Sequence, residues 1–128
     1  MKQYTDLLQT LADDTQLKSF FLTEEQKQNI FDAIADDPQY LLRNDSLTDA
    51  FFMDADFMSK CVSVAKQAHL DHLKAMEKLA KAKGKPAFEK DFIKSSVMAL
   101  EENLNKYIEY RQSCYVQTRI NEDEFANY

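Results

Sequence analysis

A single glycine, Gly84, occurs among the 128 residues of this chain, and proline occurs only at positions 38 and 86. Walker loops, dinucleotide-binding loops and nucleophile elbows need more than one glycine, because their backbones take positive φ angles or approach a ligand closely. The many tight turns of an all-β domain also depend on glycine and proline. These counts argue against such loops and against an all-β fold, and they favour an all-α protein.

Two long helices are predicted on either side of Gly84. Between residues 54 and 83, apolar side chains recur at roughly the 3.6-residue period of a helix; they are Met58, Cys61, Val62, Ala65, Ala68, Leu73, Met76, Leu79 and Ala80. A second predicted helix, from 87 to 117, has a buried face of Phe88, Phe92, Val97, Leu100, Leu104, Tyr107, Ile108 and Tyr115. Glycine supplies a left-handed residue after a helix, and proline cannot continue one. We therefore expect a long antiparallel αα-hairpin over 54–117 that turns at 84–86.

Several short helices are expected upstream, over residues 1–53. Thr23 and Gln26 have the spacing of a capping box, in which each side chain accepts a hydrogen bond from the other residue's backbone N–H. Asp37 followed by Pro38 predicts another short helix, because an aspartate caps a helix and proline is favoured at its first position. These short helices are expected to pack on the hairpin.

Two seven-residue segments, 11–17 and 34–40, share an Ala-Asp-Asp sequence at a spacing of 23 positions. This spacing suggests a two-copy repeat of short helices. We expect residues 1–117 to form a single helical domain. Residues 118–128 lose the apolar period and are predicted to be an acidic, flexible tail. Candidate contacts of this tail with a partner protein are Glu122, Asp123, Glu124 and Phe125.

The net charge of −6 is divided unevenly along the chain. Residues 66–94 hold eight lysines and four acidic residues, whereas residues 1–65 hold twelve acidic and five basic residues. Within the basic segment, a helical spacing places four lysines on one face; they are Lys74, Lys78, Lys81 and Lys85. These lysines are candidates for binding an acidic protein, a nucleic-acid phosphate or the acidic half of a second copy. The negative total charge and the absence of arginine from this segment make nucleic acid an unfavoured partner.

The two histidines, His69 and His72, lie three residues apart on one helix face, with Asp71 between them in the sequence. Two imidazoles and a carboxylate are ligands that zinc accepts. The side chains four positions after each histidine, Leu73 and Met76, would crowd a phosphoryl group on either ring. We expect no metal and no cofactor, and a metal- or phosphate-dependent protein that uses these residues is the alternative hypothesis.

No apolar run approaches the roughly 18 residues of a membrane span, and the N-terminus lacks the apolar core of a signal peptide. We therefore expect a cytoplasmic protein without membrane contact. Cys61 and Cys114 have no metal-ligand spacing and are expected to be buried free thiols.

No nucleophile arrangement of serine, cysteine and histidine is recognisable, and the paired acidic residues are expected to be helix caps. The sequence therefore favours a non-catalytic protein–protein interaction module of the adaptor, inhibitor or immunity-regulator type. A homodimer is a further expectation, and nucleic-acid contact through the lysines is the second alternative.

Overall fold

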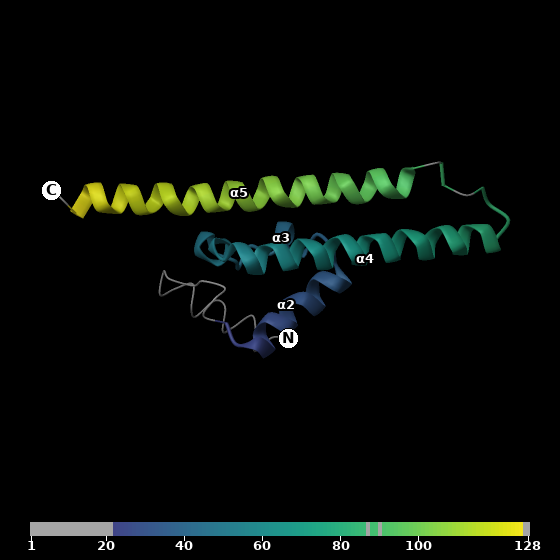
Figure 1. Ribbon diagram of the computed structural model, residues 1–128, viewed down its shortest axis with the longest axis horizontal. Helices are drawn as coiled ribbons and strands as arrows, with labels where there is room; N and C mark the ends of the chain where they lie inside the picture. The colour runs from purple at the N-terminus through teal and green to yellow at the C-terminus, as the bar shows by residue number, and fades with distance from the viewer. Residues whose placement is uncertain (1–21, 87, 90, 127–128) are drawn as a thin grey trace.

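The computed structural model describes residues 22–86, 88–89 and 91–126, with side chains as far as Asn121. This part of the chain contains helices and no strand, so the predicted all-α class is confirmed. Its elements in chain order are α2 (Glu24–Asp36), α3 (Tyr40–Arg43), the 3-10 helix η2 (Asp49–Met53), α4 (Ala55–Ala82) and α5 (Phe92–Ala126). The two longest helices, α4 and α5, lie antiparallel along the length of the molecule (Figure 1). The predicted αα-hairpin is therefore confirmed.

Both ends of α4 are fixed by local hydrogen bonds. The carboxylate of Asp54 accepts a hydrogen bond of 3.1 Å from the backbone N–H of Phe57, which caps the start of the helix. At the other end Gly84 has a φ of 76°. The N–H of Gly84 donates to the carbonyl of Lys81 at 3.0 Å, and the N–H of Lys85 donates to that of Ala80 at 2.9 Å. This pair of bonds is a Schellman motif, the helix ending that glycine favours, so the predicted role of Gly84 is confirmed.

Helix α5 differs from the prediction at both ends. It begins at Phe92 rather than at residue 87, because the chain must first cross the 8–10 Å that separate packed helix axes. The positive φ of Asp91, 66°, redirects the backbone just before the helix starts. The helix then continues to Ala126, past the predicted end at residue 117. No glycine or proline occurs after Pro86, so the sequence offers no residue that breaks it.

The predicted end of the helix at residue 117 is therefore wrong, because the backbone of residues 118–126 is helical. The candidate contacts Glu122, Asp123, Glu124 and Phe125 lie in the last turns of α5, and their side chains are outside the described part.

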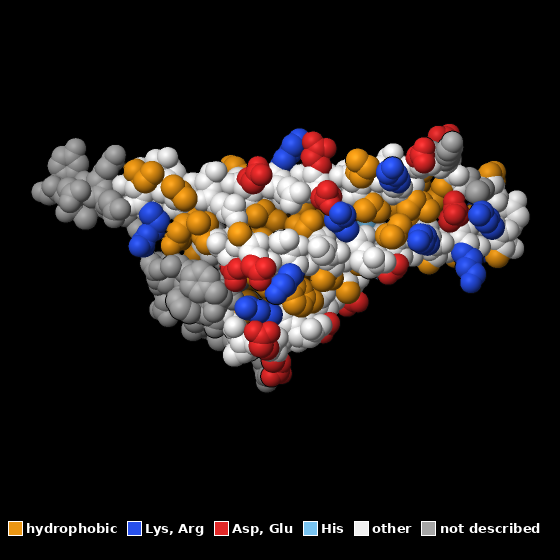
Figure 2. Space-filling model, in the orientation of Figure 1, with side chains coloured by type: hydrophobic (Ala, Val, Ile, Leu, Met, Phe, Trp, Pro, Cys, Tyr) orange, Lys and Arg blue, Asp and Glu red, His pale blue; other side chains and the backbone are white. Residues whose placement is uncertain are grey.

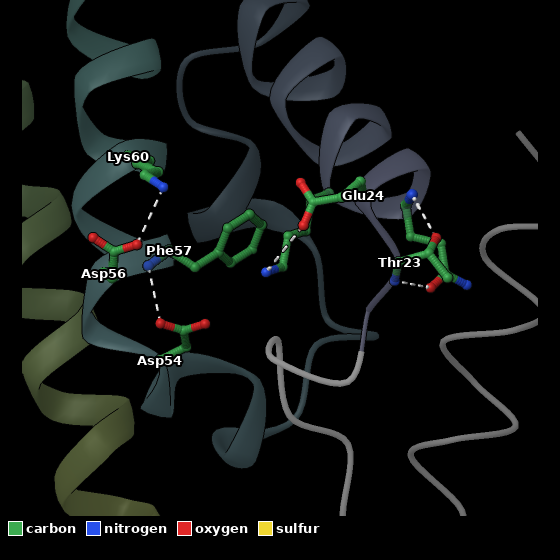
Figure 3. A network of polar contacts seen from close by, with 8 residues as sticks. Thr23, Glu24, Asp54, Asp56, Phe57 and Lys60 are labelled. Carbon is green, nitrogen blue, oxygen red and sulfur yellow. Dashed lines mark hydrogen bonds and ion pairs between the residues drawn. The ribbon is translucent and has the colours of Figure 1, made fainter.

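The predicted capping box at the start of α2 is confirmed. The Thr23 hydroxyl accepts from the Gln26 N–H at 3.1 Å, and the Gln26 side-chain oxygen accepts from the Thr23 N–H at 2.9 Å (Figure 3). The same view shows the capped start of α4, where Lys60 pairs with Asp56 at 3.1 Å. Lys27 on α2 lies 5.6 Å from the centroid of the Phe57 ring on α4, so a cation–π contact joins the two helix starts.

The next helix begins two residues later than predicted. The Asp37 carboxylate accepts from the Gln39 N–H at 3.1 Å, but Pro38 and Gln39 form a turn and α3 starts at Tyr40. The first copy of the suggested repeat, residues 11–17, lies outside the described residues.

The hydrophobic core lies in the half of the hairpin away from the turn, where α2 packs on α4 and η2 packs on α5. Phe51 and Phe52 of η2 are fully buried. The Phe51 ring meets the Phe52 ring at a centroid distance of 5.5 Å and the Phe57 ring at 6.0 Å, both edge to face, which is a favourable aromatic geometry. The segment 49–53 thus fills the space between the two long helices.

Arg111 of α5 ties the segment before α4 to the hairpin. Its guanidinium donates hydrogen bonds to the Asp49 carboxylate and to the Leu47 carbonyl, and a third to the Tyr107 hydroxyl at 2.8 Å. The guanidinium carbon also lies 4.6 Å from the centroid of the Phe52 ring. Burial disfavours the charge of Arg111, but the hydrogen bonds to Asp49 and Tyr107 outweigh it and raise the pKa.

Both cysteines are free thiols. Cys61 is buried as predicted, whereas Cys114 is only half-buried, because α5 at this point has solvent on one side. Burial, with the nearby Asp54 carboxylate, raises the pKa of Cys61 to about 12. A thiol with such a pKa is a small hydrophobic side chain at neutral pH.

Candidate functional site

The described short helices leave the half of the hairpin near its turn uncovered. Between positions 74 and 99, no residue that the structure describes is buried. The predicted burial of Phe92 is therefore wrong, since this side chain is 46% exposed, and Met76 and Leu79 on α4 are 58 and 57% exposed. The physical reason is the length of the hairpin. The 28 residues of α4 span about 42 Å, and the described short helices, within residues 22–53, cover only the half away from the turn.

An apolar groove of about 590 Å³ runs between α4 and α5 in this uncovered half. Its apolar lining comes from one residue of α4, one of the connecting loop and three of α5, namely Leu70, Phe88, Ile93, Val97 and Met98. Figure 2 shows hydrophobic side chains along the seam between the two long helices near the turn, with charged side chains around them. Open apolar surface of this kind is typical of a binding site.

The wall of the groove near the turn is held by specific contacts. The backbone N–H of Phe88 donates to the Glu77 carboxylate at 3.2 Å, and the Phe88 ring packs on the Phe92 ring at a centroid distance of 5.0 Å. The other oxygen of the Glu77 carboxylate lies 3.8 Å from the Lys81 ammonium. These contacts hold the loop against α4 at this end of the groove.

Three lysines and three carboxylates also line the groove, namely Lys66, Lys74, Lys94, Glu77, Glu89 and Asp91. Lys66 pairs with Glu101 on α5, whereas neither Lys74 nor Lys94 has an ion-pair partner among the described residues. Lys66 and Glu101 also line a second depression of about 430 Å³ on the side away from the turn. Its other polar lining residues include Ser59, Ser63, Asn105 and Glu109. The groove is therefore apolar in the middle and polar beyond the Lys66–Glu101 pair.

The predicted lysine candidates have different environments. Lys74 lines the groove, and Lys81 pairs with Glu77. Lys78 and Lys85 are exposed and line no part of the groove. Of these four lysines, only Lys74 adjoins the apolar surface of the groove.

The two candidate histidines, His69 and His72, have different surroundings. His69 Nε2 lies 2.8 Å from the Ser96 hydroxyl across the hairpin, whereas His72 is exposed. The Asp71 carboxylate accepts a hydrogen bond of 2.9 Å from Gln67. Within the described residues, no group of three or more His, Cys, Asp and Glu side chains is placed to hold a metal ion. The structure thus does not bring the three candidate ligands together.

The two tyrosines with shifted pKa values, Tyr40 and Tyr110, lie outside the groove. Burial raises the pKa of Tyr40, against the lowering effect of its hydrogen bond to Asn44. A side-chain hydrogen bond to Cys114 raises the pKa of Tyr110 on the exposed side of α5. Both hydroxyls therefore stay protonated at neutral pH.

Leu70, Ile93 and Met98 were missed by sequence reasoning as candidate binding residues. Each lies one or two positions in the sequence from the nearest residue of the apolar stripe that the periodicity predicts for its helix. The sequence feature that could have identified them is the width of the apolar arc on both long helices. An arc wider than the core-facing stripe indicates a second contact face in addition to the core.

No helix within the described ranges has both the length and the apolar character that crossing a bilayer requires. Comparison of the chain with family models, with curated proteins and with solved structures gave no match.

Proposed function

We propose that this chain is a non-catalytic protein–protein interaction module of the adaptor, inhibitor or immunity-regulator type. The observation that supports the proposal is the apolar groove between α4 and α5, which adjoins open lysines and is left uncovered by the rest of the described chain. Helical hairpins commonly present such grooves to other helices.

The groove favours a protein surface over other ligand classes. Its middle is apolar on both helices, and its six charged lining residues are equally divided between the two signs. A nucleic-acid site needs a stripe of positive charge, and catalysis needs an acid, base or nucleophile held in a defined geometry. An apolar groove with a mixed polar rim is the usual composition of a protein interface.

A photo-crosslinking residue at position 98 tests the proposal, because Met98 lines the groove and is 59% exposed. Position 76 is the matched control, because Met76 is 58% exposed and lies outside the groove lining. In an extract of the source cells, we expect a defined protein adduct from position 98 and none from position 76. Equal labelling at both positions, or no protein adduct at position 98, would refute the proposal.

A gel-shift measurement at about 50 mM salt, where phosphate contacts are strongest, addresses the nucleic-acid alternative. We expect no shift of DNA or RNA. A shift that is lost in a Lys78→Glu/Lys85→Glu variant would replace the protein-binding proposal with a nucleic-acid one, because both lysines lie outside the groove.

A further inference from the structure

Two opposite charges, Lys74 on α4 and Glu101 just beyond the end of the groove on α5, lie at equal distances from the centre of the groove. Leu70 and Val97 face each other at one level of the hairpin, since their neighbours His69 and Ser96 are hydrogen-bonded across it at 2.8 Å. Lys74 lies four residues from Leu70 towards the turn, and Glu101 lies four residues from Val97 away from it. At the rise of an α-helix, each charge is about 6 Å from the centre.

We propose that a second copy of the chain occupies this groove, related to the first by a twofold axis that passes near Leu70 and Val97. This inference rests on the proposed function and names its partner. The rotation places Lys74 of one copy beside Glu101 of the other, and the same pair forms again on the opposite side. Such a self-complementary contact is what a twofold, isologous interface requires.

The charges favour a second copy over a uniformly charged partner. An acidic helix in the groove would meet Glu89 and Asp91 near the turn and Glu101 at the other end. A basic helix would meet Lys74 and Lys94. A second copy in the reverse orientation instead brings the Lys74 ammonium, which has no ion-pair partner among the described residues of its own chain, beside a Glu101 carboxylate.

The apolar surfaces are complementary in the same arrangement. Met98 is 59% exposed, and Ile93 and Val97 are half-buried in the single chain. Two antiparallel copies bring four helices around these side chains, which is the packing of a four-helix bundle. The second copy thus covers the half of the hairpin that the described short helices leave open.

Sedimentation velocity on the full chain, between about 1 and 100 µM, is the primary test. We expect a reversible dimer whose Kd rises at least tenfold in Met98→Glu, because the substitution places two carboxylates in the apolar centre. Met76→Glu, which adds the same charge at the same exposure outside the groove, should leave the Kd unchanged. A monomeric wild-type chain, or equal effects of the two variants, would overturn the inference.

A charge exchange tests the twofold geometry. We expect Lys74→Glu and Glu101→Lys each to weaken the dimer about tenfold, and the double variant to return to within about threefold of wild type. Because Glu101 also pairs with Lys66 in its own chain, circular dichroism melts of each variant check that the monomer stays folded. A double variant as weak as the single ones would refute the proposed axis.

Crosslinking at position 98 separates this inference from the proposed function. A purified chain that crosslinks to itself supports both. A purified chain that stays monomeric but gives a defined adduct with another protein in the extract overturns the second copy and leaves the proposed function standing. A chain that gives neither product overturns both.

Discussion

Replacing Arg111 with alanine should destabilise the protein more than any single change on the exposed surface. The guanidinium is the point at which α5 holds the segment 47–53, through Asp49, the Leu47 carbonyl and the Tyr107 hydroxyl. Alanine removes the three hydrogen bonds and the contact with the Phe52 ring. It also leaves the Leu47 carbonyl and the Asp49 carboxylate without this donor.

The magnitude follows from burial. The Arg111 side chain is 15% exposed and that of Asp49 is 35% exposed, so solvent screens the pair only in part. Hydrogen bonds to charged groups contribute about 1.5–3 kcal/mol each when buried, and an exposed ion pair contributes less than about 1 kcal/mol. With the cation–π contact added, we expect a loss of about 3 kcal/mol in the free energy of unfolding. For a chain of this size that loss lowers Tm by roughly 10 °C.

Urea denaturation followed by circular dichroism measures this loss, and Lys106→Ala is the control. Lys106 lies on the same helix and pairs with Glu102 at 2.9 Å on the surface, so its removal should cost less than about 0.5 kcal/mol. Arg111→Lys should recover only part of the stability, because an ammonium cannot reproduce the planar fork of donors. An Arg111→Ala variant within 0.5 kcal/mol of wild type would refute the reasoning.

Three further changes test other parts of the fold. Gly84→Val should lower the free energy of unfolding by about 1 kcal/mol or more, because a φ of 76° is strained for any residue with a Cβ. An added Cβ would meet no neighbouring atom within 4 Å, so the whole effect would come from the backbone. An unchanged Tm in thermal melts would contradict the Schellman ending. Thr23→Ala should lower the unfolding free energy by about 1 kcal/mol through loss of the capping box, whereas an effect near zero would mean that the Gln26 half suffices. The pKa of Cys61 is about 12 in the folded chain against 9.0 for a free thiol, so the unfolded state loses its proton first and stability falls as pH rises from about 9 towards 12. Cys61→Ala should have a shallower alkaline loss of stability than wild type in urea denaturation, and an equal loss in the two proteins would contradict this reasoning.

The parts of the fold that the sequence predicted depend on local interactions. The capping box at Thr23 and the ending at Gly84 each involve residues within a few positions of one another, so their spacing in the sequence is enough. The start of α5 at Phe92 depends instead on the distance between two helices. Its end beyond residue 117 was missed because polar residues without glycine or proline still permit a helix.

The candidate site was harder to predict because exposure depends on what the rest of the chain covers. Met76 and Leu79 continue the apolar period of α4, and periodicity alone does not distinguish a buried stripe from an open one. The contacts of Arg111 with Asp49 and Leu47 join residues more than 60 positions apart, and no local pattern indicates such a pair.

The half-covered hairpin also determines how the molecule opens. Residues 57–73 of α4 and 100–108 of α5 contain buried side chains, whereas no described residue from 74 to 99 is buried. Amide protons near the turn should therefore exchange with solvent through local openings of low free energy, long before the body unfolds. Any surface that closes over the groove slows this exchange, so the resistance of these amides to deuterium reports how much of the chain is bound at a given concentration.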